Sequence, residues 1–392
     1  MPLTTVLFHG LWGLVGVLLA ELVRDGYHVL GHYYPPLMHL HSWHHRVYRK
    51  DFTPVSEGLY RQAHLVNDVP EALVMIAILA VIALVTGLWG LWAGVVYSFT
   101  FLTTAIARSR GWLITTDLTH EPGDLTTPPS NWWVNRTYHW RHHFDDTNAY
   151  FSGSITLVDK LLGTAVSLKG KTVAVTGASG ALGQALLHEL QRQKARPIAL
   201  TTTSLDQFSG DTPVWSWQPG AETDLEERLR GVDILVINHG VNVHGSRTPE
   251  AVNISLEVNA LSSWRLMQVF FSTVQTSSHR ATKEVWVNTS EAEVSPAFSP
   301  LYEISKRLLG DLVTLARLDA PCVVRKVVLG PFKSQLNPIG ILSADWVAWA
   351  LVALVKRNVH TIIVTINPLT YLLFPFKEWG QGIYFKLFSR PQ

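Results

Sequence analysis

Histidines crowd the first part of this 392-residue chain, where 12 of the 17 lie within residues 1–150. Three segments there have the forms H-x-x-x-H, H-x-x-H-H and H-x-x-H-H. On a helix, residues three or four positions apart share one face, so each segment would present two or three imidazoles to one point. Neutral imidazole binds iron, zinc, copper and nickel, and eight such histidines can hold two metal ions. They are His28 and His32; His41, His44 and His45; and His139, His142 and His143.

Two single histidines, His64 and His120, lie between the second and third segments. Other isolated histidines, such as His9, are expected to be structural. The chain has one cysteine, Cys322, which excludes an intrachain disulfide and a metal site made only of cysteines.

A second set of reactive side chains lies in the C-terminal half. The segment TGASGALG (176–183) stands where an apolar strand passes into a helix, and there the backbone can approach a pyrophosphate. Tyr302 and Lys306 are four residues apart on a helical pattern and share a face, and Ser290 ends a strand twelve residues before Tyr302. An ammonium group near a phenol favours the phenolate, so this tyrosine can exchange a proton at moderate pH.

The histidine segments flank stretches that are apolar enough to cross a membrane. Residues 72–107 contain no charge, which suits two short spans joined at Gly87–Gly90 as a helical hairpin. A buried helix pair in a soluble core is the alternative. Residues 3–23 are also apolar; with no basic segment before them and no A-x-A-like cleavage site after them, a retained membrane helix is favoured over a signal peptide.

Basic residues lie on both sides of the predicted hairpin, and positive charge tends to remain in the cytoplasm. We therefore expect an integral membrane protein whose histidine motifs and C-terminal domain lie on the cytoplasmic side. The basic residues are Arg46, Arg49, Lys50 and Arg61 before the hairpin, and Arg108 and Arg110 after it.

From Lys171 onward, short apolar strands alternate with helical patterns, which predicts a parallel sheet with helices on both faces. The expected fold is an α-helical membrane domain with a histidine metal site (1–166), followed by an α/β Rossmann-type domain (167–392). After the first strand, further strands are predicted at 198–204, 232–240, 285–290 and 323–331. Residues 345–366 read as the last helix and strand of the sheet domain. The aromatic tail after them could either complete that domain or dock on a membrane.

Composition narrows the class of protein. Charged residues make up 16% of the chain, against about 25% in an ordinary soluble protein, and hydrophobic residues make up 47%. These values argue against a disordered chain and against a simple soluble enzyme. The net charge is +2 and no basic tract stands out, which argues against a nucleic-acid partner.

Residues 20–165 resemble the fatty acid hydroxylase/sterol desaturase superfamily in the type, order and spacing of the histidine motifs, and in the closing segment 136–164. The resemblance implies that the eight motif histidines are ligands of a non-haem diiron centre, with His64 and His120 as additional candidates. It also implies O₂-dependent hydroxylation or desaturation of a lipid that arrives from the bilayer, with electrons from an unidentified donor. Zinc could occupy the same positions.

Residues 170–335 resemble the short-chain dehydrogenase/reductase family, which implies an NADP or NAD cofactor. By this resemblance Tyr302 is the general acid/base, Ser290 orients the substrate oxygen, and Lys306 binds the nicotinamide ribose and lowers the tyrosine pKa. Asn259 matches the asparagine of the family's proton relay. The expected nucleotide-binding residues are Gly177, Ser179, Gly180, Gly183, Asn238, Gly240 and Lys306.

This second resemblance has three departures. The glycines follow GxxGxxG, as in extended or atypical members, and His239 stands in INHG where a small residue is usual. The second strand, LTTTS (200–204), has no acidic residue at its end for the ribose of NAD, which favours NADP.

Together the two halves resemble cyanobacterial bifunctional sterol desaturase/short-chain dehydrogenases. They predict a bifunctional membrane oxidoreductase of lipid metabolism, in which one domain installs a hydroxyl group and the other oxidises it or reduces a carbonyl. Two alternatives remain: the Rossmann domain is a regulatory nucleotide-binding module without turnover, or the histidines form a structural zinc site without O₂ chemistry.

Overall fold

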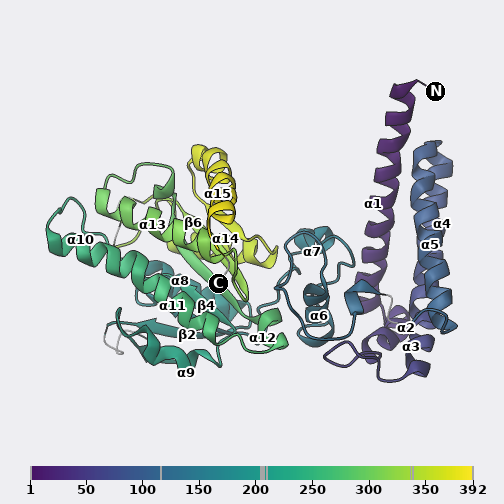
Figure 1. Ribbon diagram of the computed structural model, residues 1–392, viewed down its shortest axis with the longest axis horizontal. Coiled ribbons are helices and arrows are strands. Elements are labelled where there is room, and N and C mark those ends of the chain that lie inside the picture. Colours follow the sequence, from purple (N-terminus) through teal and green to yellow (C-terminus); the bar gives the residue numbers. More distant parts are fainter. Residues whose placement is uncertain are drawn as a thin grey trace. The chain divides into compact units, whose positions relative to one another are not determined.

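The computed structural model describes residues 2–114, 117–203, 208, 211–335, 337 and 340–390 (Figure 1). Ser204, the predicted end of the second strand, lies outside the described residues. The chain divides into two compact units, Met1–Ala165 and Val166–Gln392.

The N-terminal unit is helical throughout its regular elements. Three segments in it are long and apolar enough to cross a membrane: Leu3–Tyr33, Glu57–Thr86 and Trp89–Ser109. The last two form the hairpin expected from the apolar run. The helical elements are α1 (Leu3–Tyr33), α2 (Pro35–Arg46), α3 (Glu57–Ala63), the π-helix η1 (His64–Asp68), α4 (Val69–Thr86), η2 (Trp89–Leu91), α5 (Trp92–Ser109), η3 (Leu118–His120), α6 (Arg136–Phe144) and α7 (Leu157–Leu162).

Glycines allow α1, α4 and α5 to pack closely. Gly87 ends α4 in the left-handed region at φ 67°, where a residue without a Cβ is least strained, and the chain reverses there. A Cβ at Gly94 of α5 would lie 2.3 Å from the carbonyl oxygen of Gly16 in α1. Small residues at such a crossing let helix backbones approach, as in membrane helix pairs. This packing holds α1, whose C-terminal end carries His28 and His32.

The C-terminal unit is built on one seven-stranded parallel sheet, which confirms the predicted Rossmann-type fold. The strand order is β3-β2-β1-β4-β5-β6-β7, with its topological switch between β1 and β4. The strands are β1 (Thr172–Thr176), β2 (Arg196–Thr201), β3 (Val214–Ser216), β4 (Ile234–Ile237), β5 (Glu284–Ser290), β6 (Val323–Leu329) and β7 (Thr361–Val364). The short edge strand β3 was not among the predicted strands, because its three residues form no apolar run.

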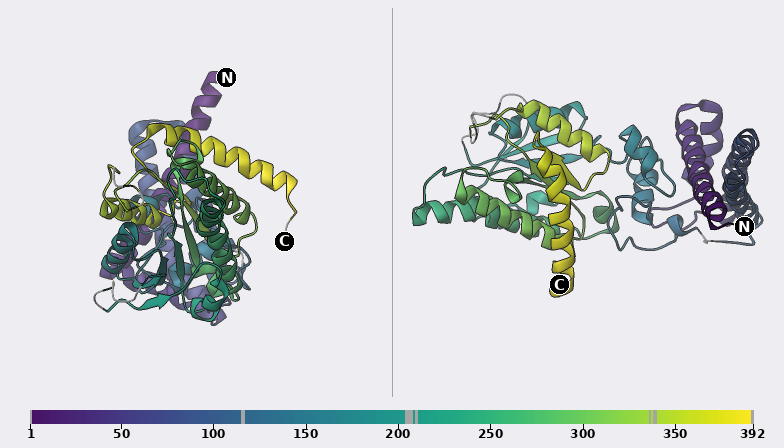
Figure 2. Two further views of the ribbon diagram at one scale, coloured as in Figure 1. Left: turned by 90° about the vertical axis from the view of Figure 1, so that its left-hand side faces the viewer. Right: turned by 90° about the horizontal axis from the view of Figure 1, so that it is seen from above.

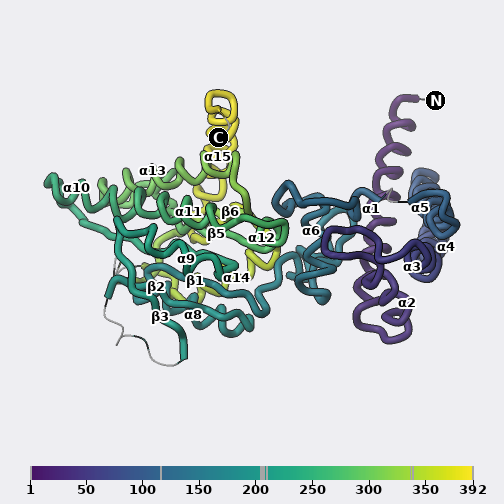
Figure 3. Tube along the Cα trace, turned by 60° about the horizontal axis from the view of Figure 1, so that its bottom comes forward, coloured from purple at the N-terminus to yellow at the C-terminus, as the bar shows by residue number. Residues whose placement is uncertain are grey.

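Helices cover both faces of the sheet (Figure 3). Successive side chains of a strand point to opposite faces, and in β1 Val173 and Val175 join the core under α8 and α14, while Ala174 joins the core under α11 and α13. The helical elements are α8 (Ala181–Arg192), η5 (Glu222–Leu225), α9 (Glu226–Leu229), α10 (Pro249–Leu256), the π-helix η6 (Glu257–Leu261), α11 (Ser262–Ser272), α12 (Ser277–Thr282), η7 (Glu291–Glu293), α13 (Pro300–Ala316), α14 (Ala344–Lys356) and α15 (Pro368–Phe388).

This topology places several of the predicted site residues at one edge of the sheet, where the parallel strands end. Parallel strands end on the same side of a sheet, and ligands of such folds bind outside those carboxyl ends near the switch point. Gly177 directly follows β1, Asn238 directly follows β4, and Ser290 is the last residue of β5. The glycine loop and the predicted reactive serine therefore lie at a common edge.

Candidate functional site

A sharp break between α1 and α2 brings the first two histidine motifs together. Tyr34 precedes Pro35 and is extended at φ −107° and ψ 112°, as expected for a residue before proline, so α1 ends and α2 begins in a new direction. Gly31 lets α2 come close, since a Cβ there would lie 3.3 Å from the Cβ of His41. His28 and His32 of α1 thus face α2.

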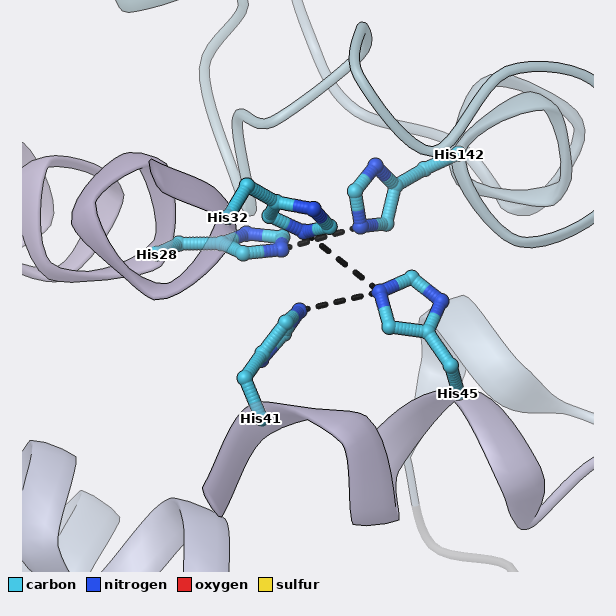
Figure 4. A group of neighbouring side chains, drawn as sticks. All are labelled: His28, His32, His41, His45 and His142. Carbon is cyan, nitrogen blue, oxygen red and sulfur yellow. Dashed lines mark hydrogen bonds between the residues drawn. The ribbon is translucent and has the colours of Figure 1, made fainter. Parts of the chain in front are cut away.

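Five histidines form the first histidine group, and each contributes one ring nitrogen to a set that lies within 4.8 Å of one another. Figure 4 shows their rings turned toward a common centre from α1, α2 and α6. The Nε2 atoms of His28 and His142 are 3.0 Å apart, as are those of His41 and His45. Neighbouring ligands that bind one ion at about 2.0–2.1 Å lie roughly 3 Å apart. The members are His28, His32, His41, His45 and His142.

The second histidine group consists of His44, His120, His139 and His143. The Nε2 atoms of His120, His139 and His143 form a triangle with sides of 2.9, 3.1 and 3.1 Å. Each imidazole nitrogen is either a donor or an acceptor, so hydrogen bonds can satisfy at most two sides of such a triangle. A shared cation would satisfy all three lone pairs.

Oxygen atoms on the outer side fix three of the rings. His41 Nδ1 lies 3.0 Å from Asn67 Oδ1, His120 Nδ1 lies 2.8 Å from Asp117 Oδ2, and His142 Nδ1 lies 2.8 Å from the carbonyl oxygen of Ala149. An acceptor at Nδ1 keeps the proton there and leaves the Nε2 lone pair facing inward, which is the arrangement that supports metal-binding histidines.

The electrostatics also favour the ligand form. Burial lowers the pKa of His139, His142 and His143 well below 6.5, and neighbouring imidazoles lower it further. Burial lowers the pKa of His45 to about 2. These rings are therefore neutral at pH 7, with lone pairs free to bind a metal.

Nine of the ten predicted metal-binding histidines thus lie in the two groups. His64 lies in neither: its Nδ1 is 2.5 Å from Asp68 Oδ2, and Asn67 Nδ2 donates to the other oxygen of Asp68 at 2.8 Å. His64 is therefore linked to His41 through Asp68 and Asn67. The sequence prediction did not include Asn67 or Asp117; the signal available for Asp117 was its spacing of three residues before His120.

The glycine loop of the C-terminal unit packs so closely on neighbouring backbone that side chains would not fit at two of its glycines. Gly177 is in the left-handed region at φ 61°, and a Cβ there would lie 2.9 Å from the Cα of His239. A Cβ at Gly183 would lie 2.2 Å from the carbonyl oxygen of Gly177. Gly180 is the residue directly before α8, and the N-terminus of such a helix is a favourable position for a pyrophosphate. The glycine loop therefore fits a dinucleotide.

Side chains around this loop link neighbouring strands. Asn238 Nδ2 donates to the Gly177 carbonyl at 3.4 Å, and Thr201 at the end of β2 lies 3.5 Å from the Ser179 hydroxyl. His239 is buried, with Nδ1 2.9 Å from Thr176 Oγ1, and burial lowers its pKa to about 3. His239 is thus a neutral structural link beneath the loop.

The predicted serine, tyrosine and lysine come together at the same edge. Burial raises the pKa of Tyr302, and a hydrogen bond with Ser290 opposes the shift. The Lys306 ammonium lies 5.9 Å from the centre of the Tyr302 ring and donates to the Asn288 carbonyl at 3.2 Å. Burial lowers the Lys306 pKa to about 8, while the Glu293 carboxylate raises it. The set can orient a substrate oxygen and exchange its proton.

Asn259 belongs to this site through a distortion of its helix. It lies in the π-helix η6, where an extra residue per turn shifts side chains, a feature frequent at functional sites. Its side chain donates to the Val241 carbonyl and to Ser305 Oγ, both at 2.9 Å, and accepts from the Val241 amide at 2.7 Å. A Cβ at Gly240 would lie 3.0 Å from Asn259 Oδ1, so Asn259 holds the loop after β4 in place.

No family model matches the chain. Over 396 aligned residues it is 55% identical to the monoglucosyldiacylglycerol epimerase of Synechocystis sp., with 96% of this chain and 97% of that protein covered. Among solved structures, it is similar to a short-chain dehydrogenase from Burkholderia cenocepacia in complex with NADP (17% identity, TM-score 0.47, 57% of this chain and 100% of that chain). It is also similar to a short-chain dehydrogenase from Sphingobium yanoikuyae in complex with NADPH (16% identity, TM-score 0.47, 57% and 98%).

Proposed function

Because the chain belongs to the monoglucosyldiacylglycerol epimerase family, we propose that it epimerises the sugar of a membrane glycolipid by reversible oxidation of one ring carbon. The observation that carries this proposal is identity to that epimerase along nearly the whole chain. The site at the edge of the sheet supplies the groups that such a reaction needs. The proposed epimerisation has no net redox change, and it takes the place of the oxidation of a sterol or fatty alcohol that was expected from the sequence.

In this proposal the chain's own residues handle the sugar hydroxyl. Ser290 and Tyr302 share a hydrogen bond and would both contact the reacting oxygen. Tyr302 would hold the proton that this oxygen releases on oxidation and return it on reduction, and the nearby Lys306 ammonium would stabilise the phenolate. When bound, a nicotinamide nucleotide would supply a hydride acceptor that takes the hydrogen from the carbon and returns it to the opposite face.

The end of β2 favours NADP over NAD in this reaction. An acidic side chain at that position commonly binds the ribose of NAD, and within the described residues β2 ends at Thr201, whose hydroxyl lies near Ser179. Hydroxyl groups there are compatible with a ribose phosphate.

A glycolipid with deuterium on every ring carbon of its glucose tests the reaction. The purified full chain with NADP⁺ should convert monoglucosyldiacylglycerol into an epimer that keeps all its deuterium, because the hydrogen moves as hydride. Mass spectrometry and NMR of the product would identify the inverted carbon. Loss of one deuterium to water would indicate deprotonation of the carbon and would contradict the oxidative route.

Lys306 gives a pH prediction for cofactor binding. Its pKa of about 8 means that the ammonium form is lost as the pH rises through 8. If this ammonium binds the nicotinamide ribose, affinity for NADP⁺ should be about tenfold lower at pH 9 than at pH 7. In Lys306→Met the affinity should be weak and independent of pH over this range. Isothermal titration measures both, and a flat profile in the unchanged protein would refute the role.

We propose a second function for the N-terminal unit: the two histidine groups hold two metal ions. Ring nitrogens that face inward from both groups, with oxygen acceptors behind three of them, favour it. Bound as iron, the two ions would supply O₂ activation and hydroxylation or desaturation of a lipid, with electrons from a separate donor. We also propose that α1, α4 and α5 cross the membrane and that the histidine groups lie on its cytoplasmic side.

A further inference from the structure

Helix α15 packs a face of mixed polar and apolar side chains against the rest of the sheet unit. Thr370 and Phe374 are fully buried, and Lys377 and Glu378 follow on the same side of the helix. Steps of three and four residues place these side chains on one face. The opposite face therefore points away from the sheet unit, and in Figure 2 the yellow helix extends beyond the body of that unit.

Buried ion pairs fix this orientation. Glu378 accepts from Lys326 Nζ at 2.7 Å and from Arg317 Nη1 at 3.0 Å, and Lys377 Nζ donates to Glu293 at 2.7 Å. Lys326 has 0% exposure in β6, so turning the helix would strip a charged partner from a buried ammonium. Ion pairs and the buried Phe374 ring therefore hold the helix in place, whereas ordinary surface helices are held mainly by an apolar stripe.

The outward face is an apolar stripe. Its members follow one another at steps of three or four residues and are 42–71% exposed. We call it the α15 stripe, and it consists of Leu369, Leu372, Phe376, Trp379, Ile383 and Leu387.

We propose that the α15 stripe docks in the interfacial layer of a lipid bilayer, with the helix lying along the membrane surface. Trp, Phe and Leu on one face are typical of interfacial helices. Within the described residues α15 is not among the helices long and apolar enough to span a membrane, and it contains Lys377, Glu378 and Lys386. The three apolar helices of the N-terminal unit, proposed above to cross the membrane, would bring the same chain to a bilayer. This proposal does not depend on the epimerase reaction.

The stripe is less suited to pairing with a second copy of the chain. The spacing of the stripe would suit a helix pair, but such a pair also needs good helix formers over several turns, and α15 contains Pro375, Gly380 and Gly382. Tyrosine and tryptophan, which favour membrane interfaces, are present at Tyr371, Trp379 and Tyr384.

Fluorescence quenching in vesicles tests the docking. The full chain would be reconstituted in phosphatidylcholine–phosphatidylglycerol vesicles that contain lipids with a doxyl quencher high in the acyl chain. A bimane label on Phe376→Cys or Ile383→Cys, in a Cys322→Ala background, should lose most of its fluorescence. The matched control is Glu227→Cys on α9, which is exposed and polar, and its label should stay bright.

A second variant separates docking from folding. Trp379→Glu should restore the fluorescence of the Ile383→Cys label without changing the melting temperature, because the inward ion pairs are untouched. Labels at Phe376 and Ile383 that stay as bright as the label at Glu227 would overturn the proposal. So would energy transfer between stripe labels of two copies in place of lipid quenching, since it would assign the stripe to a second copy.

Discussion

Tyr302→Phe should lower the rate of epimerisation by about 10²–10⁴-fold, the usual contribution of a positioned acid or base. The substitution removes only the hydroxyl that shares a hydrogen bond with Ser290, so the half-buried ring and the glycine loop should stay in place. NADP⁺ affinity should therefore change little. Turnover of monoglucosyldiacylglycerol and nucleotide titration, both on the purified full chain, measure the two quantities.

Tyr384→Phe is the matched control for this prediction. It makes the same chemical change at an exposed position of the same unit, outside the site, and should leave turnover unchanged. If Tyr302→Phe epimerises as fast as the unchanged protein while both bind NADP⁺, the sheet unit is a nucleotide-binding module that does not perform the chemistry.

The double substitution His139→Ala and His143→Ala should remove one of two metal ions from each chain. It deletes two of the four members of the second histidine group and leaves the five members of the first group intact. Protein produced with ample iron should hold two ions per chain before the change and one after it. Elemental analysis measures the content and also separates iron from zinc.

His188→Ala is the control for this loss, because His188 is an exposed histidine on α8, outside both groups. Its metal content should equal that of the unchanged protein. Epimerisation leaves the sugar lipid at its original oxidation level, so O₂ consumption that depends on both groups would reveal a separate reaction. A chain that holds no metal, or a double variant with undiminished content, would contradict the two-ion proposal.

Much of the fold followed from local patterns of apolar residues, namely a long charge-free run and a regular alternation of strands and helices. The charge-free run over 72–107 indicated the α4–α5 hairpin, and the alternation after Lys171 indicated the parallel sheet. Both signals are local, since they depend on how apolar residues repeat along one segment. The edge strand β3 gave no such signal because three residues, two half-exposed and one exposed, cannot show a period.

The partners of each histidine could not be predicted from spacing. Helical spacing shows which residues of one helix share a face, but it carries no information about which face meets another helix. His64 illustrates the limit: it looked equivalent to His120 in the sequence, yet it bonds to Asp68 while His120 joins the second group.

The same limit applied to α15. Its aromatic composition left two readings open, because composition does not say which side of a helix is buried. Which side of α15 is buried depends on Lys326 in β6 and Arg317 after α13. Both are distant from α15 in sequence, and both donate hydrogen bonds to Glu378.

Two pairs of consecutive histidines divide their members between the groups. His44 belongs to the second group and His45 to the first, and His143 and His142 divide in the same way. Neighbouring positions on a helix point about 100° apart, so one turn of α2 and one turn of α6 each serve both groups. The backbones of α2 and α6 would then fix the distance between the two bound ions. This distance between the two ion positions should stay the same whether one ion or both are bound. A one-residue insertion in either helix should disrupt both groups at once.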